Sequence, residues 1–187
     1  MDFSFSSEQT LLQDSVERFI QNDYGFDQRQ KLTGSELGFS KEHWSHFAEL
    51  GWLGLPFAEE DGGFGGSAID TMIVMEAFGK GLVVEPYVST VLMAGSALAH
   101  AGTTAQKEGH LAAIIGGEAQ ASLAYIEPQA RFNLNHVVTR AVPDGSDWVI
   151  NGFKGVVLGA PSADLLIVSA RTDGDEQAEE GITLFIV

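Results

Sequence analysis

The sequence contains no cysteine, which excludes disulfide bonds, thiolate metal sites and a cysteine nucleophile. Only 10 lysines and arginines stand against 26 aspartates and glutamates, so the formal net charge is −16 at pH 7. A charge of this sign opposes binding to nucleic acids and to anionic membranes. The sequence also lacks a signal peptide and an apolar run of membrane-spanning length. We therefore expect a cytoplasmic protein with no nucleic-acid partner and no membrane span.

The first two thirds of the sequence have the apolar periodicity of amphipathic helices. In the first of these, Leu12, Val16 and Phe19 fall on one face. Capping residues and a proline mark where such helices start, and glycines mark where they end. We expect helices that begin at Ser6, Ser40, Ser67, Pro86 and Thr104, the last two ending near His100 and at Gly116-Gly117.

After Glu118 the pattern changes to short runs rich in β-branched and aromatic residues. Pro143-Asp144-Gly145 and Asn151-Gly152 are turn sequences typical of hairpins. The expected strands are residues 121–126, 136–142, 147–150, 156–158, 164–170 and 182–187. The sequence thus predicts an α+β protein, with an N-terminal all-α helical bundle over residues 1–118. An antiparallel β-barrel-like domain over residues 119–187 follows it and is expected to be incomplete, because the last apolar run has no partner strand after it.

Gly63, Gly65 and Ala68 fit the spacing of a dinucleotide-binding fingerprint. Such a site requires a preceding strand, which Leu55-Pro56 does not provide, and three acidic residues at 59–61 would repel a phosphate. We interpret the glycines as a structural turn.

His43 and His46 lie three residues apart on an expected helix, a spacing that can bring both imidazoles to one metal ion. No third ligand follows at a recognisable spacing, so we interpret both as solvated surface histidines and expect no metal. The sequence also has no Gly-x-Ser-x-Gly elbow, which leaves a serine hydrolase without support.

Three stretches resemble the acyl-CoA dehydrogenase family. Residues 50–81, LGWLGLPFAEEDGGFGGSAIDTMIVMEAFGKG, are similar to the segment that joins early helices of that family. Residues 144–172, DGSDWVINGFKGVVLGAPSADLLIVSART, are similar to its GDxYVLNGxKxWITNGxxAD hairpin. Glu127-Pro128 falls where the family has a threonine-glutamate-proline flavin loop. The similarity covers nearly the whole chain and keeps its order.

The resemblance implies an N-terminal helical domain, a middle β domain and a C-terminal four-helix domain, of which the third is absent from these 187 residues. It implies FAD bound between the second and third domains, beside the acyl chain of a coenzyme A thioester. A glutamate removes a proton next to the thioester carbonyl while a hydride leaves the adjacent carbon for the flavin, giving the enoyl thioester. That glutamate belongs to the absent region, so we expect no catalytic residue in this chain. The partners implied are acyl-CoA, an electron-transfer flavoprotein-type acceptor and further subunits of a homo- or hetero-oligomer.

The two segments implied to hold the flavin differ in chemistry from the family pattern. Ile126 stands where the family has a threonine, and Arg131-Phe132-Asn133 where it has glycine-serine-aspartate. Val156 replaces a tryptophan, Leu158 a threonine that meets the flavin edge, and Gly159 an asparagine. The cofactor-binding residues that the resemblance implies are Tyr125, Ile126, Arg131, Phe132, Val156, Val157 and Leu158.

Ile126 and Leu158 have no side-chain donor, and each polar flavin group left unpaired would cost about 1–3 kcal/mol. Backbone N–H groups can serve instead. The guanidinium of Arg131 either binds a phosphate of the flavin or of coenzyme A or pairs with Glu127, and Phe132 either stacks or fills space.

The pattern is most similar to the small subunits of pimeloyl-CoA dehydrogenase-type enzymes. Two hypotheses follow from it. The first is an FAD-dependent acyl-CoA dehydrogenase subunit. The second is a non-catalytic structural subunit, with a degenerate flavin site, of a heteromeric acyl-CoA dehydrogenase.

Overall fold

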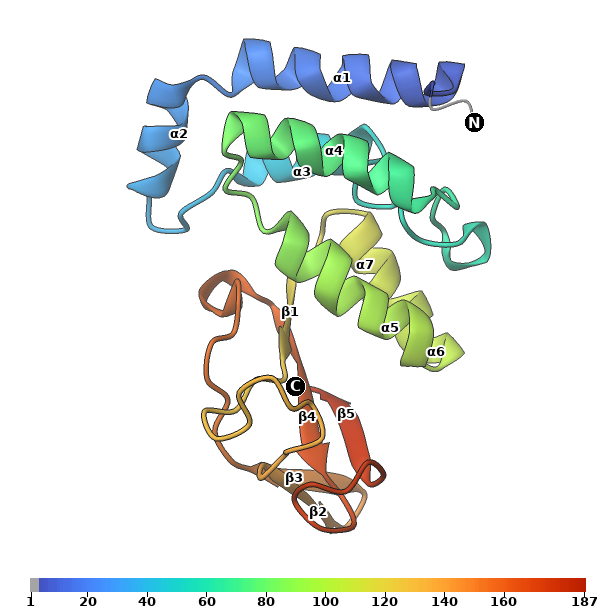
Figure 1. Cartoon of the computed structure of the whole chain (residues 1–187), viewed down its shortest axis with the longest axis vertical. Helices are drawn as coiled ribbons and strands as arrows, with labels where there is room; N and C mark the ends of the chain where they lie inside the picture. The colour runs from blue at the N-terminus through green and yellow to red at the C-terminus, as the bar shows by residue number, and fades with distance from the viewer. Residues whose placement is uncertain (1–3) are drawn as a thin grey trace.

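A computed structural model describes residues 4–187 and divides them into a helical part and a β part (Figure 1). The β part lies below the helices in this view and is joined to them through its first strand. The helical part consists of α1 (Ser7–Asp23), α2 (Phe26–Thr33), α3 (Lys41–Glu49), the short turn η1 (Glu59–Asp61), α4 (Ala68–Gly81), the continuous pair η2 (Val88–Gly95) and α5 (Ser96–Ala101), and the run α6 (Thr104–Gln106), η3 (Lys107–Leu111) and α7 (Ala112–Ile115).

The helices start where the capping residues predict. Ser6 and Ser67 form reciprocal capping boxes with Gln9 and Asp70, and the Ser40 hydroxyl accepts from the His43 N–H. The sequence did not predict α2. Its N-cap, Gly25, makes no side-chain cap and the helix buries no residue, so neither capping chemistry nor apolar periodicity identifies it.

An aromatic cluster holds the helices together. Phe47 stacks on Phe78 with ring centroids 5.0 Å apart, and Phe19 meets Phe47 edge-on at 5.2 Å. The Tyr87 ring packs edge-on against Phe78 at 5.3 Å, and its hydroxyl donates to the carbonyl of Trp52 at 2.9 Å. Truncating a buried ring of this kind typically costs about 3–5 kcal/mol, so the cluster is a main source of stability in this part.

The β part is one open sheet with mixed strand directions. Its strands are β1 (Ala121–Ala124), β2 (Arg140–Asp144), β3 (Asp147–Asn151), β4 (Leu165–Arg171) and β5 (Ile182–Ile186). Their order is β1-β4-β2-β3, and β5 also pairs with β4. The β2–β3 and β4–β5 pairs are antiparallel, whereas β1 runs parallel to β4 in the register Ala121↔Leu165.

The α+β prediction is confirmed, but the antiparallel barrel-like sheet is not. After β1 the chain makes the β2–β3 hairpin and then re-enters the sheet in the same direction, so β4 lies parallel to β1. Within residues 4–187 the strands do not close on themselves.

One strand prediction is wrong and a second is confirmed only in its last residues. Residues 156–158 form no ladder and lead through Gly159 into η4 (Ala160–Ser162). In the run 136–142 the strand begins only at Arg140, because the N–H groups of Val138 and Thr139 donate to the carboxylate of Glu127. The Thr139 carbonyl accepts from the Arg171 N–H at the end of β4 at 2.7 Å, but residues 136–139 are not part of a strand.

The helices and the sheet meet in a tight seam. The Thr90 hydroxyl on η2 donates to the carbonyl of Ala121 at 3.1 Å and lies 3.3 Å from the nitrogen of that residue. Gly159 has φ +77°, and a Cβ placed there would lie 2.5 Å from the Ser89 hydroxyl oxygen. The loop at 156–159 therefore lies directly against η2, and a side chain at 159 would push it away.

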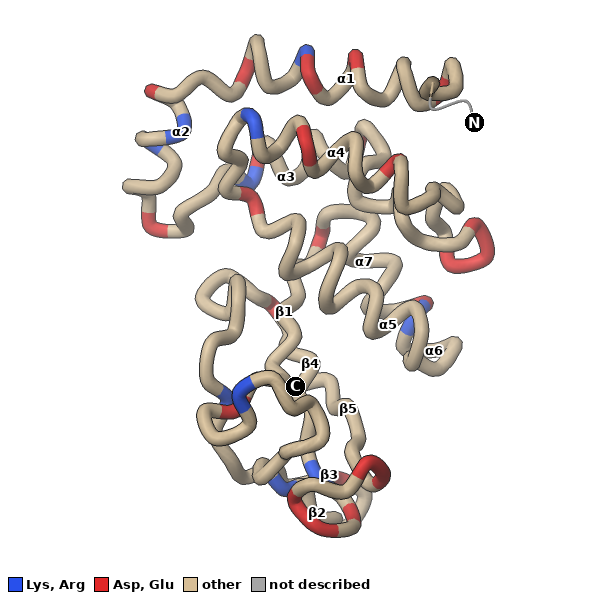
Figure 2. Tube along the Cα trace, viewed as in Figure 1, with Lys and Arg blue, Asp and Glu red and all other residues tan. Residues whose placement is uncertain are grey.

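Charge and hydropathy add two observations. Figure 2 shows acidic residues over both parts of the molecule, with a concentration on the loop at 173–181. No helix within residues 4–187 has the length and hydropathy needed to cross a membrane.

Candidate functional site

The bend after Ile126 and the segment that follows β3 lie in contact. The Gly155 N–H donates to the carbonyl of Ile126 with a nitrogen-to-oxygen distance of 2.7 Å. The bend itself is a turn closed by the Ala130 N–H on the carbonyl of Glu127 at 3.0 Å. The resemblance implied a flavin at these two segments, and the fold brings them together from either side of the β2–β3 hairpin.

The surface around this junction carries uncovered apolar side chains. Val156 is 66% exposed, Leu158 51% and Phe132 100%. Tyr125, Ile126 and Val157 are half-buried beside them. A cavity of about 360 Å³ adjoins Leu158 and Gly159 and reaches across the seam to Val88. Exposed apolar surface of this kind marks a place where a ligand or another protein surface binds.

Backbone donors are free at the same place. Within residues 4–187 the N–H groups of Ile126, Val156, Val157 and Leu158 make no hydrogen bond to another protein group. An apolar surface edged by free N–H groups suits a flat ligand with carbonyl and ring-nitrogen acceptors. The chemistry of these residues therefore fits a flavin ring, although the two threonine hydroxyls of the family pattern are absent.

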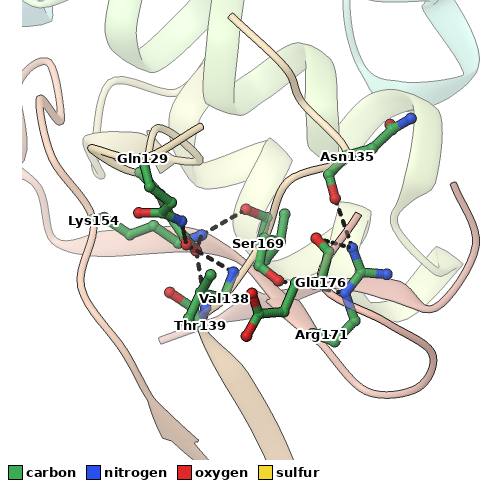
Figure 3. Close-up of polar contacts among 10 residues, drawn as sticks. Gln129, Asn135, Val138, Thr139, Lys154, Ser169, Arg171 and Glu176 are labelled. Carbon is green, nitrogen blue, oxygen red and sulfur yellow. Dashed lines mark hydrogen bonds and ion pairs between the residues drawn. The ribbon is translucent and has the colours of Figure 1, made fainter. Parts of the chain in front are cut away.

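A buried carboxylate lies directly under the bend. Glu127 is 2% exposed, and Lys154 Nζ lies 2.7 Å from its Oε1. The backbone N–H groups of Thr139 and Val138 donate to the same carboxylate at 3.1 and 2.8 Å, and Gln129 Nε2 donates at 2.6 Å. Lys154 also donates to the Ser169 hydroxyl on β4 at 2.9 Å. Figure 3 shows these groups converging between the bend and the sheet.

The environment of Glu127 decides its protonation state. Burial raises the pKa of this carboxyl, but the hydrogen bonds from Lys154, Thr139 and Val138 outweigh burial and lower the pKa from 4.5 to about 2. The carboxylate is therefore ionised at neutral pH and already has four donors. This state of Glu127 is unsuited to a general base.

Sequence reasoning assigned no role to Lys154 or Ser169. The signal available for the lysine was the NGxK tetrad of the hairpin, Asn151 to Lys154, which the resemblance already contained. Neither the distance to Glu127 nor the contact with β4 can be read from spacing, since both depend on how the hairpin folds back.

Of the two alternatives for Arg131, the pairing with Glu127 is not formed, because Lys154 occupies that position. Arg131 is exposed, has φ +51° and makes no ion pair or hydrogen bond within residues 4–187. A non-glycine residue in this conformation is uncommon. Phe132 next to it is fully exposed, so it does not fill space in the described chain. Both side chains are free to contact a ligand.

A second buried carboxylate, in the helical part, corrects the interpretation of the histidines. His43 is not solvated, because its Nδ1 lies 3.2 Å from Oε1 of the buried Glu85. The Tyr24 hydroxyl donates to the same carboxylate at 2.7 Å. Burial and this bond raise the pKa of Tyr24 well above its usual range. His46 is exposed beside Glu49, and residues 4–187 contain no group of three or more histidines and acids arranged for a metal ion.

The turn at Gly63 is structural, as interpreted. A Cβ at Gly63 would lie 2.2 Å from the carbonyl oxygen of Phe57, so the close approach of two backbone segments requires glycine. The chain before it is a series of turns and no strand.

Comparison with known proteins gives consistent results. The family model described as "Acyl-CoA dehydrogenase, N-terminal domain" matches residues 6–118, and that described as "Acyl-CoA dehydrogenase, middle domain" matches residues 122–187. The chain is 31% identical over 190 residues to the probable acyl-CoA dehydrogenase YngJ of Bacillus subtilis, covering 100% of this chain and 49% of the relative. It is 32% identical over 185 residues to the mitochondrial isovaleryl-CoA dehydrogenase of Pongo abelii, covering 97% and 44%.

Solved structures with the same fold include the ChsE4-ChsE5 complex from Mycobacterium tuberculosis, with a TM-score of 0.87 and 28% identity. The match covers 100% of this chain and 48% of that one. The FAD complex of PigA has a TM-score of 0.86 and 27% identity, covering 100% and 49%. The chain thus spans about half the length of the relatives it matches.

Proposed function

The chain belongs to the acyl-CoA dehydrogenase family, and we propose that it is a subunit of an FAD-dependent dehydrogenase that converts an acyl-CoA thioester to the enoyl-CoA. The observation that carries this proposal is the junction of Ile126 with Gly155, which lies beside exposed apolar side chains and backbone N–H groups that have no acceptor among residues 4–187. We further propose that residues 1–118 and 119–187 are the first two domains of the full-length enzyme.

The chain's own residues have defined tasks in this proposal. When bound, FAD supplies the hydride acceptor. Ile126, Val156 and Leu158 would pack against one face of the ring and exclude water from it, and the free N–H groups beside them would donate to its polar edge. Tyr125 and Val157 would complete the packing.

Arg131 and Phe132 would act beyond the ring. Since the guanidinium of Arg131 has no carboxylate partner in the described part of the chain, it is available to a phosphate of FAD or of coenzyme A. The fully exposed Phe132 would stack on an aromatic part of the same ligand. The reacting proton requires a base that these residues do not provide.

We propose that the protein is one subunit of a hetero-oligomer. We also propose that the enzyme passes its electrons to an electron-transfer flavoprotein-type acceptor. Two structural relatives carry two-protein names, the ChsE4-ChsE5 complex and the Tcur3481-Tcur3483 steroid ACAD, the latter at a TM-score of 0.84 and 29% identity. These relatives support a search for a partner subunit of the same family.

A second candidate function is a non-catalytic subunit that stabilises an active partner. The absence of side-chain donors at Ile126 and Leu158 favours it. The full-length protein, purified alone and with its partner, distinguishes the two functions. We expect bound-flavin absorbance that bleaches on addition of an acyl-CoA, whereas colourless protein in both preparations would contradict the enzyme proposal.

Restoring both hydroxyls tests how the native site binds. If backbone groups already hold the flavin, the double variant Ile126→Thr with Leu158→Thr adds two hydroxyl donors to the site. We expect it to tighten FAD binding by about 10-fold, which is the effect of roughly one net hydrogen bond. The measurement is a fluorescence titration with FAD. Val149→Thr, an exposed site on β3, is the control and should leave the Kd unchanged. A change from no binding to full occupancy in the double variant would instead show that the native site is degenerate.

A further inference from the structure

We propose that Glu127 and Lys154 form a clamp that positions the two flavin-facing segments against each other. Neither residue would touch the flavin, so both are positioning residues. The role of the clamp in flavin binding rests on the proposed function. The contacts that form the clamp lie within this chain and do not depend on that function.

The pair connects four separate pieces of backbone. Glu127 lies in the bend after β1, and its carboxylate also takes the N–H groups of Val138 and Thr139, which precede β2. Lys154 lies beyond the end of β3 and reaches Ser169 in the middle of β4 at 2.9 Å. One ion pair thus sets the position of the bend relative to the hairpin and to the sheet beneath it.

Both charged groups are bonded within the protein. On Glu127, Oε1 accepts from Lys154 and Thr139, and Oε2 accepts from Gln129 and Val138. The Lys154 side chain is only 8% exposed. Since both side chains are buried, the pair affects a ligand through the position of its neighbours.

Those neighbours belong to the two segments proposed to face the flavin. Ile126 directly precedes Glu127, and Gly155 directly follows Lys154. The 2.7 Å hydrogen bond from the Gly155 N–H to the Ile126 carbonyl lies between them, so the ion pair and the backbone bond hold the same junction. Without Lys154 the buried carboxylate would be left charged and unpaired, and water entering to solvate it would separate the two segments.

The test compares two buried cations in the full-length protein, with its partner subunit if it has one. Lys154→Met removes the clamp, and Arg171→Met removes a buried cation whose donors reach only backbone carbonyls at 135–137 and 176–180. We expect Lys154→Met to speed amide exchange of the Gly155 segment by about 10-fold. We also expect it to weaken FAD binding by about 30-fold and blur the resolved flavin absorption band. Arg171→Met should change neither the Gly155 exchange nor the FAD affinity by more than about 3-fold.

Each outcome decides something. Unchanged exchange at Gly155 in Lys154→Met overturns the clamp, whether or not flavin binds. Equal loss of FAD affinity in Arg171→Met also overturns it, because general destabilisation would then explain both. A wild-type protein that binds no FAD overturns the proposed function and the flavin role of the clamp, while the exchange data still decide whether the clamp exists. If either methionine variant fails to fold, the milder pair Glu127→Gln and Arg171→Lys carries the same expectations.

Discussion

Replacing Arg171 by methionine is expected to lower the free energy of unfolding by about 3–5 kcal/mol, measured by urea denaturation. Arg171 is 1% exposed and has no carboxylate partner among residues 4–187. Its guanidinium donates instead to carbonyls on both sides, to Asn135 at 2.7 Å (Figure 3) and to Glu180 at 2.6 Å among others. The Asn135 carbonyl keeps the Val137 N–H as a donor, but methionine leaves the carbonyls of Ala178 and Glu180 without the donors that Arg171 supplies. Each buried acceptor left unpaired costs about 1–3 kcal/mol unless water reaches it.

The expected loss of stability is large because Arg171 holds the loop at 173–181. The loop at 173–181 carries several acidic residues and repels itself, so it has little intrinsic tendency to fold. Arg171 supplies both the positive charge and the hydrogen bonds that hold its backbone. Arg140→Met is the matched control, since Arg140 is exposed and lies opposite Arg171 in the β2–β4 pair. We expect a change within about 0.5 kcal/mol there, and an equal loss in both variants would contradict this role of Arg171.

The stability of the protein should depend on pH through Glu127. The folded-state pKa is lowered from 4.5 to about 2, so the unfolded chain binds this proton more readily than the folded one. The ionised carboxylate therefore stabilises the fold fully above pH 4.5, and its contribution is lost as the pH falls towards 2. A shift of this size corresponds to a contribution on the order of 3 kcal/mol.

Glu127→Gln isolates that contribution, because glutamine cannot titrate. We expect the difference in unfolding free energy between wild type and Glu127→Gln to be largest at pH 6–7 and to shrink by on the order of 3 kcal/mol at pH 2. Glu108→Gln is the control, since the Glu108 side chain is exposed and makes no ion pair or hydrogen bond within residues 4–187. A difference between wild type and Glu127→Gln that stays constant over this range would show that the ion pair with Lys154 is not formed.

Local chemistry made much of the helical part predictable. Ser6, Ser40 and Ser67 cap their helices as expected, because an N-cap hydroxyl bonds to backbone two or three residues away and can be read from sequence. The helix α2 was missed because it has no side-chain cap and buries no residue, while the contacts of Arg29 with the Leu82 carbonyl and of Leu32 with the core are long-range. The β2–β3 hairpin was equally readable from its turn residues.

The candidate site was predictable only in part, because its contacts are between residues far apart in the sequence. The family resemblance identified Ile126 and residues 156–158 as belonging together, and the fold joins them through Gly155. The partners of Glu127 were not predictable, since Lys154 and Arg131 were equally suitable cations by chemistry. Only the path of the hairpin decides that Lys154 reaches the carboxylate. The role of Arg171 was not predictable either, because every residue has a backbone carbonyl and the sequence does not show which carbonyls a side chain reaches.

The central claim is that Ile126 and the segment 156–158 form one face of a flavin site. Amide hydrogen exchange of the full-length protein, with and without FAD, tests it most directly. We predict that FAD slows exchange by about 10-fold or more in peptides containing Ile126 and residues 156–158, where free N–H groups would gain acceptors. Peptides from the loop at 173–181 should exchange at the same rate in both states. Protection elsewhere in the protein, with both of these segments unchanged, would contradict the account.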